Sequence, residues 1–213
     1  MKPIIVIAKG EHARRVPPSG HYHVAACSEA VRLCDRCEYL AVNDVPALGE
    51  LTGEDFAKSA RLIMPAFLHV DSIPSGFVHA GFEIARVFNS LPVYSHETPQ
   101  CTYYRLHTDP EPSKYKGIIP YFGRCRSVSD SLIAWLLHAG YRNFALLGIS
   151  TTRIQSYHKM FKRRFHKTND HRCSIWNTTE KRLKKHNAAY RSIRSDEQLQ
   201  QWTEECERVP VQA

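Results

Sequence analysis

Small and polar residues follow three apolar runs of this sequence at the point where each run ends. Lys9 and Gly10 follow the first run, Ser28 follows the second, and Asn43 and Asp44 follow the third. In an open parallel sheet the carboxyl ends of the strands lie at one edge, where ligands bind. A glycine there lets a phosphate approach the backbone, and a carboxylate such as Asp44 can hold ribose hydroxyls. The pattern predicts a nucleotide site at that edge.

Two further turns fit the same site. Ser127 and Ser129 open a helical segment, whose free N–H groups and positive dipole end suit a phosphate, and Ser150 follows a late apolar run. For each position taken alone, an ordinary turn or helix cap is the alternative. The sequence contains neither GxGxxG nor GxxxxGK[ST], so neither a standard dinucleotide site nor a P-loop is expected.

The elements that would position these loops alternate between strand and helix. Apolar runs at 3–8, 23–26, 39–42 and 143–149 suit buried parallel strands, and weaker strands are expected at 61–64 and 101–106. Residues 127–140 open with a capping-box pattern and close on a glycine, which predicts a helix. Other helices are expected at 29–34, capped by Ser28, and at 79–89, 155–165, 180–191 and 196–208. This order predicts an α/β fold: a Rossmann-like, mostly parallel sheet flanked by helices.

Positive charge is concentrated in the C-terminal part of the chain. Between Arg153 and Arg194 there are 13 Lys and Arg against two Asp and Glu, which favours a polyanionic partner. We therefore expect a Rossmann-like nucleotide-binding domain at 1–152 and a basic helical C-terminal region at 153–213. The candidate nucleic-acid contacts are Lys159, Lys162, Arg163, Arg164 and Lys167. A solvated helix face is the alternative, and Phe161 and Phe165 are expected to pack against the sheet.

Targeting signals and metal motifs are weak. No run approaches 18 apolar residues and the N-terminal run is too short for a signal peptide, so a cytoplasmic protein without a transmembrane segment is expected, in the host cytoplasm if it is viral. The seven cysteines are expected to be free thiols. Cys34 and Cys37 form one CxxC pair, with His21, His23 and Cys27 upstream. Zinc sites normally show two such pairs, and the thioredoxin context is missing, so no metal or redox site is predicted.

One long segment resembles a known family. Ser127–Ser150, SVSDSLIAWLLHAGYRNFALLGIS, is similar to the late helix–strand element of sialyltransferase-like glycosyltransferases. In that family a small-residue turn opens the helix, GY or GA ends it, and the next strand finishes in GxD. Ile4–Gly10, His23–Ser28 and Glu38–Asp44 are similar to the family's early strands. The resemblance covers about residues 1–155, and Ser150 stands where the family has the aspartate of GxD.

The resemblance implies a Rossmann-like enzyme that uses a nucleotide-sugar donor without an obligatory metal. Transfer would invert the sugar, with a histidine as general base. His158 is the candidate base, with His79 and His107 as rivals, and Asp44 is the second catalytic candidate. The residues placed at the donor are Gly10, Glu11, Ser28, Asn43, Ser127, Ser129, Ser150 and Tyr157, the last beside the leaving phosphate.

The basic C-terminal region would suit a polyanionic acceptor. Modified bases of viral DNA, such as phage DNA, are one such acceptor. The alternative hypothesis is a non-catalytic protein, in which a degenerate nucleotide-binding domain carries a nucleic-acid-binding region.

Overall fold

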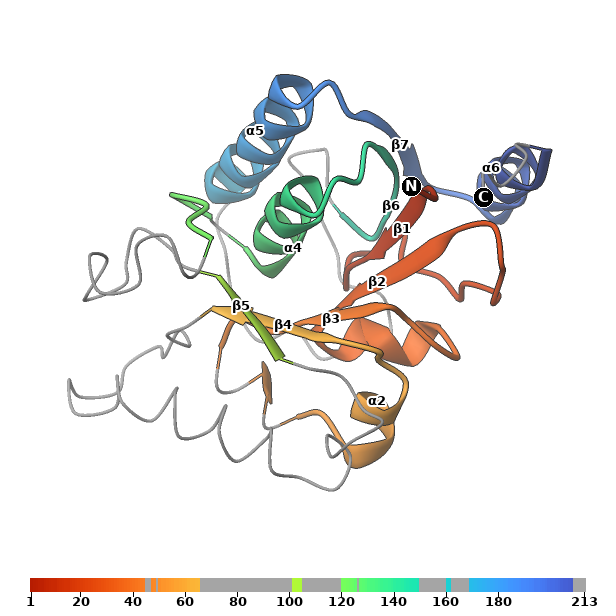
Figure 1. Cartoon of the computed structure of the whole chain (residues 1–213), viewed down its shortest axis with the longest axis horizontal. Helices are drawn as coiled ribbons and strands as arrows, with labels where there is room; N and C mark the ends of the chain where they lie inside the picture. Colours follow the sequence, from red (N-terminus) through yellow and green to blue (C-terminus); the bar gives the residue numbers. More distant parts are fainter. Residues whose placement is uncertain are drawn as a thin grey trace.

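Seven parallel strands form one sheet, in the order β5-β4-β3-β2-β1-β6-β7 (Figure 1). A computed structural model describes residues 1–44, 47–48, 50–65, 101–104, 120–125, 127–149, 160–161 and 169–208. The strands are β1 (Ile4–Ile7), β2 (His23–Cys27), β3 (Tyr39–Ala41), β4 (Leu62–Pro65), β5 (Cys101–Tyr104), β6 (Asn143–Leu147) and β7 (Ala189–Ile193). The predicted α/β, Rossmann-like architecture is confirmed.

The strand order reverses at β1. Strands β1 to β5 progress towards one edge of the sheet, whereas β6 and β7 are added on the other side of β1. Ile5 of β1 is therefore paired with Val24 of β2 on one side and with Ala145 of β6 on the other. Doubly wound sheets of this kind bind ligands beyond the carboxyl ends of the strands, next to the reversal.

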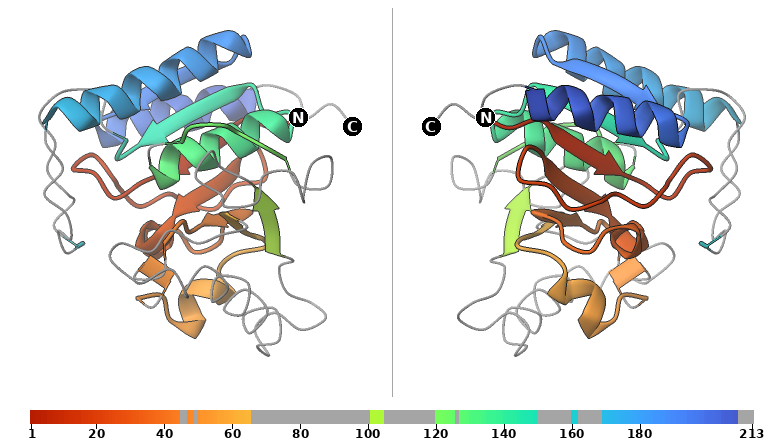
Figure 2. Two further views of the ribbon diagram at one scale, coloured as in Figure 1. Left: turned by 90° about the vertical axis from the view of Figure 1, so that its left-hand side faces the viewer. Right: turned by 90° about the vertical axis from the view of Figure 1, so that its right-hand side faces the viewer.

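Helices cover both faces of the sheet (Figures 1 and 2). The core on one face includes residues of the 3-10 helix η1 (Ser28–Leu33), α2 (Gly53–Ala57) and α6 (Asp196–Arg208). The opposite core includes residues of α4 (Val128–His138) and α5 (Asn169–Lys185). Alternate residues of β1 enter the two cores, and all four are fully buried, which explains why this strand is a continuous apolar run. No helix in the described ranges is long and apolar enough to cross a bilayer.

Of the two serines predicted to cap helices, one does so in the structure and the other does not. Ser127 caps α4 as expected, and its Oγ accepts a hydrogen bond from Asp130 N at 3.1 Å. Ser28, in contrast, is not a cap. It is the first residue of η1 and has a φ of 51°, while Cys27 occupies the cap position without a side-chain hydrogen bond. A left-handed serine at the end of β2 makes the turn tighter than an ordinary N-cap would.

The C-terminal region is not wholly helical, and the helix predicted at 180–191 is confirmed over 180–185 and wrong beyond it. Helix α5 ends at Lys185, Asn187 takes a φ of 51°, and β7 then pairs with β6 along its whole length. A left-handed asparagine is a common helix terminator. The C-terminal region therefore contributes the edge strand β7 to the sheet. Helix α6 lies at Asp196–Arg208, where the sequence predicts a helix. The helices predicted at 79–89 and, apart from 160–161, at 155–165 lie outside the described residues.

Candidate functional site at the carboxyl edge of the sheet

The loops after β1, β2 and β3 and the start of α4 meet at the carboxyl edge. Asn43, which follows β3, donates a hydrogen bond from Nδ2 to Ser131 Oγ of α4 at 2.9 Å. Tyr104, the last residue of β5, donates its hydroxyl to Asn43 Oδ1. Lys9, which follows β1, contacts Glu29, which follows β2, at 3.2 Å. Gly10, Asn43 and Ser127 therefore lie at one edge, as the sequence predicts.

The chain's own backbone closes the space directly beyond β1 and β6. Ala8 N donates to Leu147 O at 2.8 Å, and Gly10 N donates to Gly148 O at 2.9 Å. Gly148 has a φ of 64°, and a Cβ added there would lie 2.3 Å from Ala8 O. Gly148 is thus required for the close approach of the two loops. Because the Gly10 N–H is already used, a ligand would contact the edge on the β2 and β3 side of Gly10.

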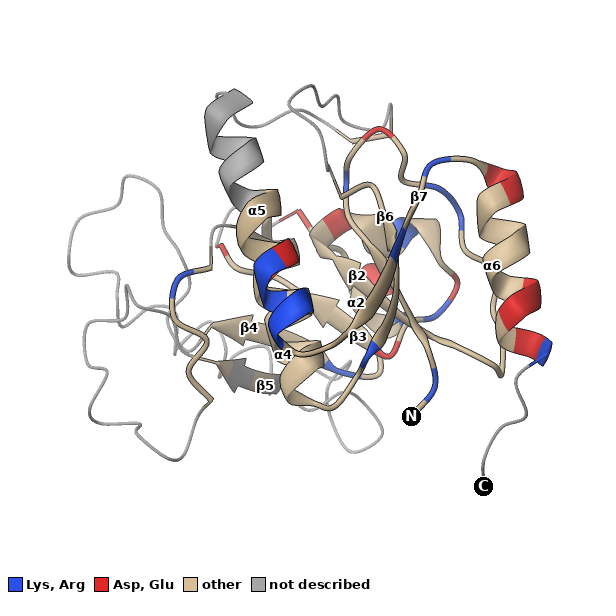
Figure 3. Ribbon diagram, turned by 90° about the horizontal axis from the view of Figure 1, so that it is seen from above, with Lys and Arg blue, Asp and Glu red and all other residues tan. Residues whose placement is uncertain are grey.

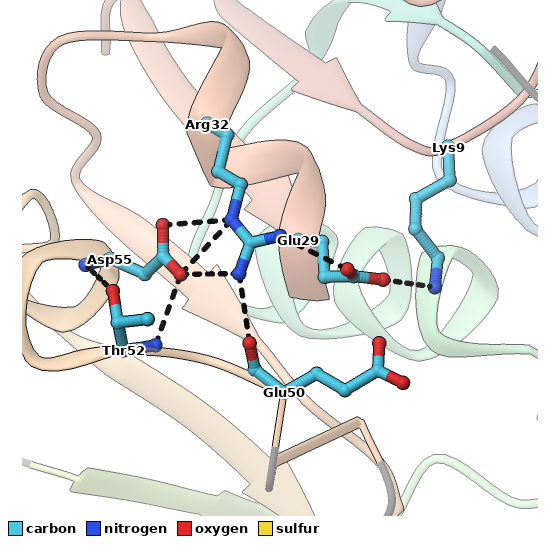
Figure 4. A network of polar contacts seen from close by, with 6 residues as sticks. All are labelled: Lys9, Glu29, Arg32, Glu50, Thr52 and Asp55. Atoms are coloured by element: carbon cyan, nitrogen blue, oxygen red, sulfur yellow. Dashed lines mark hydrogen bonds and ion pairs between the residues drawn. The ribbon is translucent and has the colours of Figure 1, made fainter. Parts of the chain in front are cut away.

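A network of charged side chains covers the edge beside η1 and α2 (Figure 4). Glu29 contacts Lys9 at 3.2 Å and Arg32 at 3.1 Å, and Arg32 also contacts Asp55 at 2.8 Å. Arg32 Nη2 donates in addition to the Glu50 carbonyl at 2.8 Å. Both carboxylates are buried, at 7% exposure for Glu29 and 4% for Asp55. The charges of two cations, Lys9 and Arg32, are balanced by those of two anions, Glu29 and Asp55. We call these four residues the edge network.

Arg32 and Asp55 of the edge network have shifted pKa values. Hydrogen bonding to Asp55 raises the pKa of Arg32 above its already high value. Burial works to raise the pKa of Asp55, but the hydrogen bonds from Arg32 and Thr52 outweigh it, so the pKa is lowered. Asp55 and Thr52 also form the capping box of α2. The network therefore holds the loop before α2 in a fixed, charged arrangement against η1.

Lys9 is the cation of the edge network with capacity for another anion. Arg32 is committed to two carboxylates and a carbonyl. Lys9 Nζ carries three N–H groups and contacts one carboxylate oxygen among the described residues, and its side chain is 17% exposed. An ammonium group with free donors at the carboxyl edge is suited to bind a phosphate.

A cluster of serine hydroxyls surrounds the first turn of α4, which packs on the face of the sheet opposite η1 and α2. Ser127 Oγ and Ser129 Oγ are 3.0 Å apart, and Ser131 Oγ donates to Ser127 O at 3.0 Å. The N–H groups of Val128 and Ser129, the first two of the helix, have no intrahelical acceptor, as at every helix start. These N–H groups and the helix dipole favour an anion.

Helix α5 holds the first turn of α4 from behind. Thr179 donates its hydroxyl to Asp130 Oδ1 at 3.0 Å, and Arg182 Nε lies 3.5 Å from the same oxygen. Arg182 also donates to the carbonyls of Phe122 and Arg124, in the segment that leads into α4. Asp130 is fully buried. This contact fixes the helix start relative to the sheet, and the sequence analysis did not predict it.

Several predicted site residues have structural partners. Both ends of the Asn43 amide are hydrogen-bonded, to Tyr104 and Ser131, so Asn43 positions α4. Asp44 Oδ1 accepts from Ala47 N at 2.7 Å and so stabilises its own turn. Ser28 is 3% exposed, and Glu11 is exposed.

The other predicted residues lie outside the described part of the chain. They include the candidate base, its rivals, two donor residues and all the predicted nucleic-acid contacts: His158, His79, His107, Ser150, Tyr157, Lys159, Lys162, Arg163, Arg164 and Lys167. Their roles stay predictions. Phe161, between two of them, is described and is 6% exposed in the core that contains η1, which agrees with the predicted packing role.

Comparison of the chain with protein-family models, curated proteins and solved structures gives no match. Within the described ranges, no three or more His, Cys, Asp or Glu side chains are grouped so that they could hold a metal ion.

Proposed function

We propose that this chain is a glycosyltransferase that binds a nucleotide-sugar donor at the carboxyl edge of the sheet. The main support is the meeting of four separate segments there: the loops after β1, β2 and β3 and the first turn of α4. Doubly wound parallel sheets commonly bind nucleotides at this edge, and the all-parallel sheet of this chain supports the proposal in that way. Glycosyl transfer itself rests on the sequence resemblance.

Within this proposal the described residues divide into contact and positioning roles. Lys9 Nζ and the first N–H groups of α4 are proposed to bind the donor phosphates. Ser28 is 3% exposed and Asp44 Oδ1 already accepts from Ala47 N, so these two residues have positioning roles. Asn43 and Ser127 hold α4 in place, because their polar atoms are already used within the protein.

His158 is the proposed general base. It removes the proton of an acceptor hydroxyl while that oxygen attacks the anomeric carbon, and the bond from this carbon to the phosphate oxygen breaks. The nucleotide then leaves with the bonding electrons. A polyanionic acceptor, such as a hydroxylated base of viral DNA, is proposed to contact the basic segment around Lys162.

A thermal-shift screen with CMP-, UDP-, GDP- and dTDP-sugars and with the free nucleotides tests donor binding. A nucleotide-sugar at one hundred times its Kd should stabilise the folded chain by about 2.7 kcal/mol. Lys9→Gln should weaken this shift, whereas Lys2→Gln, at the opposite end of the same strand, should leave it unchanged. If none of these compounds raises the Tm of the wild-type chain, the glycosyltransferase proposal fails.

Non-catalytic nucleic-acid binding is the second candidate function, and α5 supports it. Lys181, Lys184 and Lys185 are exposed on the second half of this helix, where Glu180 is the only acidic residue between 176 and 185 (Figure 3). Exposed Arg142 lies close enough to His186, after the end of α5, to lower the pKa of that histidine. We call the group formed by Lys181, Lys184, Lys185 and Arg142 the α5 face. Exposed cations of this density bind phosphate backbones mainly by charge.

Fluorescence anisotropy with a labelled DNA duplex over a range of salt concentrations tests the second candidate. Lys181→Glu combined with Lys185→Glu should reduce the slope of log affinity against log salt by about 2, since each phosphate contact contributes about 0.9. Arg208→Glu, an exposed charge reversal at the end of α6, is the control and should leave the slope unchanged. A wild-type chain that does not bind the duplex at low salt would contradict this function.

A further inference from the structure

A pair of cysteines lies at the amino edge of the sheet, opposite the candidate nucleotide site. Cys34 ends η1, and Cys37 lies two residues before β3. Both side chains are buried, at 2% and 4% exposure. The two residues between them, Asp35 and Arg36, are exposed. The loop therefore turns both thiols inwards and lies at the surface itself.

The backbone on each side of this loop is fixed. Cys34 N donates to Val31 O at 3.2 Å, and Cys34 forms a parallel bridge with Val16. Cys37 N donates to Lys58 O at 2.8 Å, and Cys37 forms a second parallel bridge with Ser59. The separation of the two cysteines is thus set by hydrogen bonds to two different parts of the chain.

Cys34 Sγ donates a hydrogen bond to Val31 O at 3.3 Å. The side chains of Cys34 and Cys37 lie near enough to each other for hydrogen bonding between them to shift the pKa of both thiols. The hydrogen bond from Cys37 lowers the pKa of Cys34, and nearby Lys58 acts in the same direction. The same hydrogen bond and burial raise the pKa of Cys37. One sulfur is therefore the better nucleophile and the other retains its proton.

Cys27, Cys125 and Cys206 have a different environment. Burial raises the pKa of Cys27 to about 12 and that of Cys125 and Cys206 to about 11. A thiol with a raised pKa reacts slowly with oxidants, because the thiolate is the nucleophile. Cys34 is thus distinguished from these three thiols by a second thiol close to it and by its lowered pKa.

We propose that Cys34 and Cys37 form an oxidisable dithiol site that hydrogen peroxide converts to an intramolecular disulfide. The Cys34 thiolate attacks one peroxide oxygen, the O–O bond breaks, and Cys34 becomes a sulfenic acid while hydroxide takes up a proton to leave as water. The Cys37 sulfur then attacks the Cys34 sulfur, the S–O bond breaks, and a second water leaves. Two thiols are oxidised and one peroxide is reduced.

The disulfide would join the end of η1 to the start of β3. It forms at the edge of the sheet opposite Lys9 and α4, so it does not depend on nucleotide binding. Dithiothreitol would reverse it, since thiol–disulfide exchange returns both sulfurs to thiols.

Thiol counting on the full-length chain tests the proposal. The folded protein is treated with a small excess of hydrogen peroxide, quenched, denatured and alkylated, and modified peptides are mapped by mass spectrometry. The chain has seven cysteines, so the alkylated number should fall from seven to five, with the missing pair at Cys34 and Cys37. Dithiothreitol should restore seven. Cys206→Ser is the control and should lose the same pair.

Single variants separate the two sulfurs. In Cys37→Ser the sulfenic acid should persist on Cys34 and be trapped by dimedone, whereas Cys34→Ser should trap none at position 37. If either variant fails to fold, the peptide map of the wild-type chain still decides. Retention of all seven thiols, loss of a different pair, or stoichiometric zinc in the purified protein would overturn the proposal.

Discussion

The edge network and the α5 face contain the same kinds of charged residue in opposite arrangements. In the edge network two cations and two carboxylates are paired at 3.2 Å or less, and both carboxylates are buried. On the α5 face, lysines and arginines outnumber the single acidic residue and are mostly exposed. Paired, buried charge fixes geometry, whereas exposed charge of one sign selects a partner. The two regions therefore contribute to function in different ways.

Removing one member of the edge network should have the largest effect. Asp55→Ala leaves Arg32 without its main partner and also breaks the capping box of α2. Arg32 is one-third exposed and keeps Glu29 and the Glu50 carbonyl, so we expect a loss of about 2.5–4 kcal/mol of unfolding free energy from the missing charge-assisted hydrogen bonds and the missing cap. Urea denaturation followed by circular dichroism measures this loss. Asp35→Ala removes the exposed pair with Arg15 and should cost about 0–1 kcal/mol. Equal losses in the two variants would contradict the contrast between buried and exposed charge.

The junction of the β1 and β6 loops should give the next largest effect. Gly148→Ala places a Cβ 2.3 Å from Ala8 O in a left-handed conformation, so both backbone loops must shift. We expect a loss of about 2–3 kcal/mol from strain and overpacking. Gly20→Ala is the control, because nothing lies within 4 Å of its added Cβ. A Tm in Gly148→Ala equal to that of the control would show that the two loops are not tightly joined.

Charge reversal on the α5 face should hardly change stability. Lys181→Glu with Lys185→Glu alters exposed side chains on the solvent side of α5, so the expected change in unfolding free energy is within about 0.5 kcal/mol. The same urea titration measures it. A loss as large as that of Asp55→Ala would mean that these lysines are part of the folded framework and not a free surface.

Lowering the pH should change the contributions of the two regions to stability, by less than the substitutions above. The pKa of His186 is lowered by partial desolvation and by Arg142, Lys185 and Arg182, so the unfolded state takes up the proton first and this group reduces stability below about pH 6.5. Asp55, whose pKa is lowered, contributes stability above about pH 3.9 that is lost as the pH falls through its folded value. Proton NMR titration, assigned with His186→Asn, should show a pKa below 6.5 that rises when DNA is added. An unchanged pKa with bound DNA would place the contact elsewhere.

Strands buried on both faces were predictable from the sequence, and contacts between distant residues were not. Runs such as Ile4–Ile7 are continuously apolar because both faces of the sheet are covered. β7 was missed because this edge strand is mostly exposed, and Arg191 within it follows a basic helix. The edge network joins Glu29 and Arg32 to residues more than 15 positions away. Its one local sequence pattern, the Thr52–Asp55 capping box, was not among the predicted helix starts.

The central position of β1 has a consequence for biosynthesis. β1 is made before the other strands of this sheet, yet one of its two edges pairs with β6, which is synthesised about 140 residues later. Until then a nascent chain displays an open, apolar strand edge, which is prone to pair with other chains. Chains that stop before residue 143 should therefore aggregate or need a chaperone, and contacts of such high sequence separation should make refolding slow.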